Sequence, residues 1–393
     1  MTSTPPPGHP ILQALSRRSF LKGLGGGATL LWTAASTGCG YFPAEEGEAY
    51  APWNFPGGEE RPEYIAVGAA ILAANPHNTQ PWLFRITPER IDLYADMSKS
   101  LGAMDGLHRE MTIGLGCALE NLVWAAAAAG RRAEVTLTPD DADPTWVASV
   151  ALTPATPEPS ALYEAIPRRH TNRGRYMNAA PPAELEGALR ERVFEPEVHL
   201  TFLVEDAERA AFRSGTIDAT KAIIHDREMN HDSHVWYRHT KEELDRNRDG
   251  LTLDATGAGA TLRALGKVVG RPTADEAGQH WLDATRDAHT TGSAFCLLST
   301  PDRDSRREQL LCGRAYQRLH LWATTVGLAM HPLNQMAERQ DREQLLGLEP
   351  RFTNLLHGLI GSDQMGAQML FRVGYPWDDA LTSPRRPIDW VTR

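Results

Sequence analysis

The sequence has few cysteines, few aromatic residues and no excess of basic charge. Its 393 residues include four cysteines, at positions 39, 117, 296 and 312, and no Cys-x-x-Cys pair occurs among them. This excludes a zinc ribbon and a thioredoxin-type site, and it favours buried free thiols for the last three. The formal net charge of −10 excludes a general nucleic-acid-binding surface, although a local basic pocket remains compatible with it. The content of 41% apolar and 23% charged residues is typical of a soluble globular protein.

A long membrane-spanning run is also missing from the N-terminus, which carries a different signal. Arg17 and Arg18 precede a short, Gly-rich apolar run from Leu24 to Gly38, and Cys39 follows. A stable span needs roughly 20 apolar residues, so this run is too short. The order of charge, apolar run and small residues predicts a twin-arginine export signal over residues 1–40. Two outcomes stay open at Cys39, namely lipid attachment and cleavage without lipid.

Export has two consequences for the rest of the chain. Cargo of the twin-arginine machinery crosses the membrane folded, and this is mostly needed when a cofactor is inserted in the cytoplasm. The leader therefore predicts a cofactor, and it places the protein outside the cytoplasm, in the periplasm or an equivalent compartment, with a membrane attachment only through lipid on Cys39.

The remainder of the chain divides at stretches rich in Pro and Gly. Residues 41–60 are rich in Pro, Gly and Glu and predict a solvated tether. A first unit follows over 61–153, and a second unit over 154–393 contains a polar segment, 227–280, that is predicted to be an insertion or lid. Both units have a polar loop, strands and a long core helix that ends in Gly, which indicates an internal duplication. The predicted helices are 63–74, 109–129, 182–192, 207–226 and 306–326, and the predicted strands are 83–87, 90–95, 134–138, 146–153, 199–204, 291–300 and 369–373.

The first polar loop runs from Asn75 to Trp82 and contains His77, Asn78 and Gln80. Asn and Gln side chains offer paired donors and acceptors that can bind the edge of a heterocycle. The same composition also fits a rigid turn whose prolines fix the backbone. Both readings remain open from the residues alone.

A basic segment stands near the start of the second unit. Arg168, Arg169 and Arg173 lie within six residues, together with His170. Guanidinium groups bind phosphate oxygens in a bidentate manner, so the segment fits a phosphate clamp, to which the C-terminal pair at 385–386 can add. A solvated basic turn is the alternative.

Four motifs in this order resemble the FMN-dependent nitroreductase superfamily. They are Asn78-Thr79-Gln80-Pro81-Trp82, the segment 168–173, Pro332-Leu333-Asn334 after Gly327-Leu328, and Pro384-Arg385-Arg386-Pro387 after Gly374-Tyr375-Pro376. Their order and spacing are most similar to the Acg-like branch, in which one chain carries both halves of the site. The resemblance covers roughly residues 61–393.

The resemblance implies an α+β, nitroreductase-like fold in which two pseudo-repeated halves of one chain correspond to an intertwined dimer. It implies that FMN lies between the halves. The implied contacts to the flavin phosphate and ring come from four segments: Asn75, His77, Asn78 and Gln80; Arg168, Arg169, His170 and Arg173; Pro332, Leu333 and Asn334; and Arg385 and Arg386.

The implied activity is a flavin-mediated two-electron reduction of a small acceptor such as a quinone or a nitroaromatic. No essential side-chain base is expected, because flavin chemistry belongs to the cofactor. Since an exported protein meets little NAD(P)H, a non-catalytic protein that sequesters flavin is the alternative. Four histidines in the predicted lid, at positions 225, 231, 234 and 239, are not expected to form a metal site.

Overall fold

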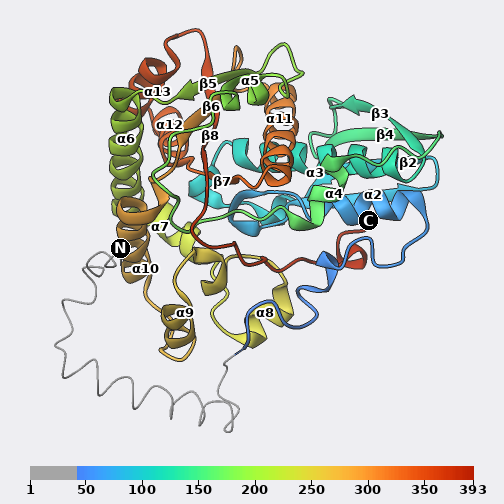
Figure 1. The fold of residues 1–393 in the computed structure, drawn as a ribbon, viewed down its shortest axis with the longest axis horizontal. Coiled ribbons are helices and arrows are strands. Elements are labelled where there is room, and N and C mark those ends of the chain that lie inside the picture. The colour runs from blue at the N-terminus through green and yellow to red at the C-terminus, as the bar shows by residue number, and fades with distance from the viewer. Residues whose placement is uncertain (1–41) are drawn as a thin grey trace, which may run out of the picture.

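The computed structural model describes residues 42–393, and the predicted export signal lies outside this range (Figure 1). The fold is α+β, as expected: two four-stranded antiparallel sheets are joined by long helices. The core is continuous across the two sheets, because buried residues of both pack in one cluster around the central helices.

The first sheet has the strand order β1-β2-β4-β3. Its strands are β1 (Trp82–Thr87), β2 (Arg90–Ala95), β3 (Arg131–Leu137) and β4 (Trp146–Pro154). In β3 exposed and half-buried residues alternate, as expected for a strand with one face in solvent. The helix α2 (Pro62–Ala70) precedes this sheet, and α3 (Arg109–Ala128) connects β2 to β3.

The second sheet repeats this arrangement with the order β5-β6-β8-β7. Its strands are β5 (His199–Leu203), β6 (Ala294–Thr300), β7 (Ala329–Pro332) and β8 (Gly366–Gly374), and α11 (Arg306–Thr325) connects β6 to β7. Gly130 after α3 and Gly327 after α11 have φ values of 74° and 73°. Both positions need a left-handed residue to end a helix and turn into a strand, and glycine adopts that conformation without steric cost. The fold is therefore two pseudo-repeated halves.

The two long helices cross at a pair of glycines. A Cβ atom on Gly116 would lie 3.0 Å from Cα of Gly313, and a Cβ atom on Gly313 would lie 2.9 Å from Cα of Gly116. The helices can approach this closely only because neither residue has a side chain. Although α3 is long and apolar enough to cross a membrane, most of it is buried against α2 and α11.

Polar contacts flank this crossing. Arg318 of α11 is buried and forms an ion pair with Glu120 of α3 at 2.7 Å, and Gln317 donates to Asn121 at 2.8 Å. Since Glu120 and Asn121 come from the other half, these contacts help to set the register of α3 against α11.

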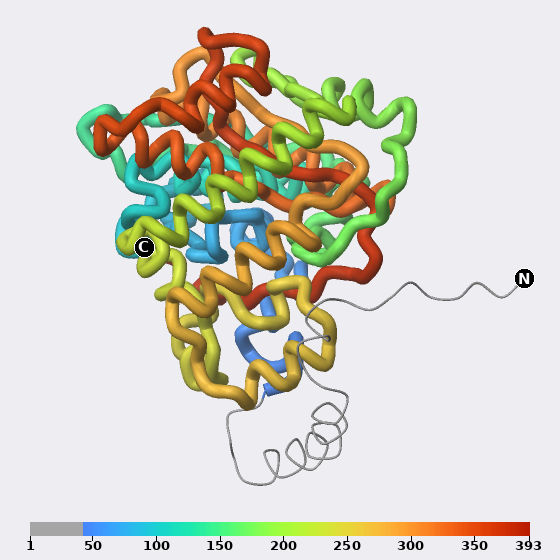
Figure 2. Tube along the Cα trace, turned by 90° about the vertical axis from the view of Figure 1, so that its left-hand side faces the viewer, coloured from blue at the N-terminus to red at the C-terminus, as the bar shows by residue number. Residues whose placement is uncertain are grey.

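Of the remaining helices, α4 (Ala161–Ala165) packs against α11 and α3, and the others lie around the second sheet or form the predicted lid (Figure 1). The others are α5 (Leu185–Arg190), α6 (Asp206–His225), α7 (Arg227–His234), α8 (Lys241–Asn247), α9 (Ala260–Gly266), α10 (Ala274–Ala284), α12 (Gln335–Leu346) and α13 (Arg351–Ile360). The helices α7 to α10 lie together at one end of the molecule, beside the segment that follows residue 42 (Figures 1 and 2).

Residues 42–60 do not form the solvated tether that their composition predicted. Phe42, Ala49 and Tyr50 are buried and pack with Leu244 of α8. Trp53 packs against the same cluster. The prediction was wrong because a few large apolar side chains were enough to bury a segment otherwise rich in Pro, Gly and Glu.

The C-terminal tail returns from the second half to the first sheet. The backbone N–H of Phe84 donates to the carbonyl of Val391, and that of Arg393 donates to the carbonyl of Phe84, both at 2.7 Å. The tail thereby pairs with β1, the edge strand of the first sheet, and Val391 is fully buried in the core.

Candidate functional site

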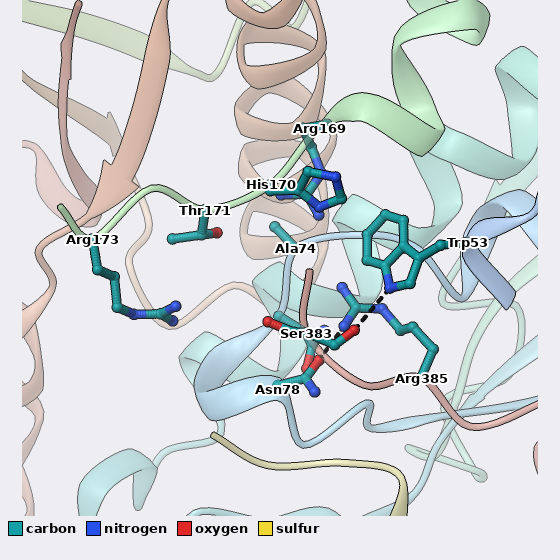
Figure 3. A pocket seen from close by; sticks show the side chains of 10 residues that line it. Trp53, Ala74, Asn78, Arg169, His170, Thr171, Arg173, Ser383 and Arg385 are labelled. Atoms are coloured by element: carbon teal, nitrogen blue, oxygen red, sulfur yellow. Dashed lines mark hydrogen bonds between the residues drawn. The ribbon is translucent and has the colours of Figure 1, made fainter. Parts of the chain in front are cut away.

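A cleft lies where three distant segments meet: the loop after α2, the basic segment after α4 and the C-terminal tail (Figure 3). It is lined by Trp53, Ala74, Asn75, Asn78, Arg169, His170, Thr171, Arg173, Ser383 and Arg385. The structure thus brings together six of the predicted site residues, namely Asn75, Asn78, Arg169, His170, Arg173 and Arg385.

The loop after α2 is a strained turn held by its own side chains. His77, Asn78 and Gln80 have φ values of 45°, 56° and 55°. The side-chain oxygen of Asn75 accepts from the backbone N–H of Gln80 at 2.8 Å, and its amide donates to the carbonyl of Ala73 at 3.1 Å. Left-handed non-glycine residues are costly and persist only where their surroundings hold them, which makes the loop a candidate functional element.

Asn78 joins the loop to the lid and to the tail. Its amide nitrogen donates to the carbonyls of Gly250 at 3.1 Å and Pro384 at 2.9 Å, and its oxygen accepts from the guanidinium of Arg385. Because both ends of the amide are engaged, Asn78 acts here by positioning Arg385.

Arg169 and Arg385 lie side by side at the cleft. Their guanidinium groups donate to the same acceptor, the carbonyl of Leu72, at 3.0 and 3.4 Å, and Arg385 also donates to the carbonyl of Ala73 at 3.2 Å. These carbonyls follow the C-terminal end of α2, where the helix dipole favours cations. Figure 3 shows the two side chains reaching the cleft from different segments, Arg169 from the basic segment after α4 and Arg385 from the C-terminal tail.

Neither charge is balanced by a carboxylate. Within residues 42–393 no Asp or Glu forms an ion pair with Arg169 or Arg385, although the two side chains are only 2% and 3% exposed. Nε and Nη1 of Arg169 and Nε of Arg385 have no hydrogen-bond partner. Burial lowers the pKa of Arg169 to about 10, and burial together with the charge of Arg169 lowers the pKa of Arg385. Two buried cations with free donors make a site for an anion with several oxygens.

The two histidines beside these arginines are held neutral. His170 contacts the ring of Trp53 edge-on, with centroids 4.5 Å apart, and burial followed by the charges of Arg169 and Arg385 lowers its pKa to about 3. Burial and the charge of Arg173 lower the pKa of His77 to about 4. Nε2 of His77 lies 2.9 Å from Oγ of Ser233 in the lid, so this ring connects the loop to α7.

A third cation lies at the other end of the cleft. Arg173 donates to the carbonyl of Ala255 at 3.1 Å, and Figure 3 shows it far from Trp53 and Arg385. The backbone around it is fixed by Arg372 of β8, which donates to the carbonyls of Asn172 at 3.2 Å and Gly174 at 2.6 Å. Arg372 is therefore a positioning residue for the basic segment.

Seven other predicted residues do not line the cleft: Arg168 and the segment 332–334, Gln80 and Arg386, and His77. Arg168 is exposed, and its Nε donates to the carbonyl of Glu164 at 3.2 Å, so it does not line the cleft with Arg169. Leu333 is buried in the core of the second half, and Asn334 accepts from the backbone N–H of Leu370 at 2.8 Å. Pro332 pairs with Phe371 within the second sheet.

Arg386 and Gln80 form a structural contact behind the cleft. Gln80 accepts from the backbone N–H of Arg386 at 2.8 Å and donates to the carbonyl of Arg248 at 2.8 Å. The guanidinium of Arg386 donates to the carbonyl of Gln80 and lies 3.7 Å from the carboxylate of Asp96. The predicted basic pair at 385–386 is thus divided, because successive residues of an extended tail point in opposite directions.

Sequence reasoning missed Trp53, Ser383 and Arg372. Nε1 of Trp53 donates to the carbonyl of Ser383 at 2.8 Å, which closes one end of the cleft. An aromatic residue in a supposed tether, and an arginine inside the apolar strand around 369–373, were the available signals. Cys117, Cys296 and Cys312 are buried free thiols, as expected. In the described part of the chain no three His, Cys, Asp or Glu side chains converge as a metal ion requires.

Comparison with known proteins places this geometry in context. No family model matches the chain. The chain is similar to two proteins of Mycobacterium tuberculosis: it is 28% identical over 335 residues to Putative NAD(P)H nitroreductase Rv3131 (82% of this chain, 88% of that protein) and 26% identical over 332 residues to Putative NAD(P)H nitroreductase acg (83% and 93%). The expected resemblance to Acg-like nitroreductases is thereby confirmed.

Solved structures with a distant likeness include two nitroreductases. The FMN-dependent nitroreductase NfnB of Mycobacterium smegmatis, in complex with NADPH, has a TM-score of 0.38 at 16% identity and covers 59% of this chain and 97% of that chain. A nitroreductase of Bacteroides fragilis with bound FMN has a TM-score of 0.33 at 14% identity and covers 58% and 95%.

Proposed function

We propose that this protein is an exported FMN-binding oxidoreductase of the nitroreductase superfamily, which reduces a small acceptor such as a quinone or a nitroaromatic. The observation that carries the proposal is the pair of buried, unbalanced guanidinium groups of Arg169 and Arg385. The similarity to proteins named as NAD(P)H nitroreductases over more than four fifths of the chain supports the same reading. Export rests on Arg17 and Arg18 before the apolar run.

The residues of the cleft fit the two polar ends of FMN. Arg169 and Arg385 would hold the phosphate, because their free N–H groups supply charge-assisted hydrogen bonds to its oxygens. Arg173, at the opposite end, would stabilise negative charge on the pyrimidine side of the ring. When bound, flavin supplies the two-electron chemistry.

The remaining residues hold this arrangement and limit the entry of water. Asn78 fixes Arg385, Arg372 fixes the backbone around Arg173, and the lid closes on the loop through His77 and Ser233. His170 and His77 are neutral near neutral pH, so they add no further positive charge beside the arginines. The chain's own contribution is thus binding, orientation and electrostatics.

A pair of neighbouring substitutions tests the proposal. The purified protein should show flavin absorbance, and Arg169→Gln should weaken FMN retention by about 10- to 100-fold, the equivalent of one charged hydrogen-bonding partner. Arg168→Gln is the matched control, because Arg168 is exposed and should leave retention unchanged. Equal retention in both variants would contradict the assignment of the phosphate site.

Titration of the same samples with NADH, NADPH and dithionite separates the two functions that the sequence left open. Reduction by a nicotinamide donor followed by reoxidation with a quinone supports the oxidoreductase. A flavin that only dithionite reduces would favour sequestration instead.

A further inference from the structure

An apolar patch is exposed at the outer end of the lid, away from the cleft. Leu262, Leu265, Val268 and Val269, on α9 and the turn after it, are 39–67% exposed. Single exposed apolar residues are ordinary, but four of them within eight residues are an unusual local concentration. We call these four residues the α9 patch, and we infer that the α9 patch contacts a lipid membrane by inserting its side chains among the headgroups.

The point at which the described chain begins lies at this patch. The ammonium group of Lys267 donates to the carbonyl of Phe42 at 3.0 Å and lies 4.4 Å from the centroid of its ring. Lys267 immediately precedes Val268 and Val269. Figure 2 shows the start of the coloured chain among the lid helices at the same end of the molecule.

This position restricts where an N-terminal attachment can be. Cys39 is three residues before Phe42, and a residue spans at most about 3.6 Å, so the Cα atom of Cys39 lies within roughly 11 Å of that of Phe42. A membrane that holds the chain at Cys39, or through the apolar run before it, would therefore be within reach of the α9 patch. The α9 patch therefore lies near the point at which the segment with an expected membrane contact joins the described fold.

The charges around the patch indicate how it would bind. Residues 257–273 contain Arg263, Lys267 and Arg271 and no Asp or Glu. However, Lys267 and Arg263 pair with Asp254 at 2.6 and 3.4 Å, and Arg271 pairs with a glutamate of α8 at 3.3 Å. Since these cations are already paired, attraction to anionic lipid adds little, and the apolar side chains carry the contact. Binding should depend only weakly on the charge of the lipid.

The experiment places an environment-sensitive fluorophore on the patch of the full chain, in a Cys39→Ser background. Leu265→Cys provides the attachment site, and Cys117, Cys296 and Cys312 do not compete because they are buried. The matched control is Leu346→Cys, 52% exposed at the end of α12, a helix that Figure 1 shows beside the second sheet and away from α9. Adding phosphatidylcholine vesicles should shift the emission of the label at 265 to the blue, and adding phosphatidylglycerol should change this shift little. The label at 346 should not respond.

Four results would overturn the inference. The first is no shift at position 265, and the second is an equal shift at both positions. The third is a shift without vesicles that grows with protein concentration, which would show that a second copy of the chain covers the patch. The fourth is a blue-shifted emission without vesicles at every concentration, which would show that the chain covers its own patch. Flavin absorbance of the same samples is read separately, so loss of the vesicle response and loss of FMN are distinguished.

Discussion

At the scale of single residues, one unusual titrating group outside the cleft is Glu110. It is 6% exposed and lies in a buried cluster with Asp105, Glu338 and Asp341, where Arg109 donates to it at 3.3 Å. Burial is the largest influence and raises the pKa of Glu110 to about 7, while the charge of Arg109 opposes this shift. The folded protein therefore keeps a proton on Glu110 that the unfolded chain releases near pH 4.5.

This shift predicts the pH dependence of stability. Because the folded-state pKa is raised, the stabilising contribution of Glu110 is present below about pH 4.5 and is lost as the pH rises to about 7. In Glu110→Gln, which mimics the protonated side chain, the free energy of unfolding should therefore fall less over this interval than in the natural protein, by roughly 1–3 kcal/mol. Denaturant unfolding of both proteins at a series of pH values measures this difference in the free energy of unfolding. The exposed Glu134→Gln is the control, and identical pH profiles for natural protein and Glu110→Gln would refute the prediction.

The cleft shows what a sequence can and cannot predict about individual residues. The types of residue and the segments that meet were predictable from motifs, and Arg169, Arg385 and Asn78 do meet. The directions in which neighbouring side chains point were not predictable. Arg168 and Arg169 differ only in where the end of a short 3-10 turn directs each side chain, and tertiary contacts decide that direction.

At the scale of elements, α3 and α11 depend on the contact between Gly116 and Gly313. Gly313→Ala would place a Cβ atom 2.9 Å from Cα of Gly116, against backbone that cannot move aside as a flexible side chain can. We expect the free energy of unfolding to fall by roughly 1–3 kcal/mol. Gly358→Ala, also in a helix but with no atom within 4 Å of its new Cβ, should be neutral or stabilising by roughly 0.5–1 kcal/mol. Thermal denaturation of both variants makes the comparison, and equal midpoints would exclude tight packing at this crossing.

Helices were predicted correctly where apolar residues recur at helical spacing, and they were missed where the buried face of the helix is polar. The long helices α3, α6 and α11 lie within a residue or two of their predicted bounds. The helices α12 and α13 were not predicted. In α12 the buried residues include Gln335, Glu338, Gln340, Asp341 and Glu343, so its inner face is polar and lacks the apolar stripe by which a helix is recognised.

At the scale of the whole molecule, the two halves are joined by more than the central helices. The tail of the second half carries Arg385 to the cleft and then continues to pair with β1 of the first sheet. The same few residues of the tail therefore contribute both to the cleft, where an anion would bind, and to the edge of the first sheet at β1. The tail is anchored on both sides of Arg385, by Asn78, Gln80 and the carbonyl of Ala49 around it and by the pairing with Phe84 beyond it.

Two changes in the tail test this coupling. A chain that ends at Pro387 keeps both arginines but loses the two backbone hydrogen bonds to Phe84 and the buried side chain of Val391. Its free energy of unfolding should fall by roughly 2–5 kcal/mol, and its FMN retention should fall as well, because the tail is then no longer fixed on the C-terminal side of Arg385. Val391→Ala removes side-chain packing alone, so it should lower stability by roughly 1–2 kcal/mol and leave retention intact. Flavin fluorescence after gel filtration reports retention. If the truncated chain held FMN as firmly as Val391→Ala does, the pairing with β1 would have no part in positioning Arg385.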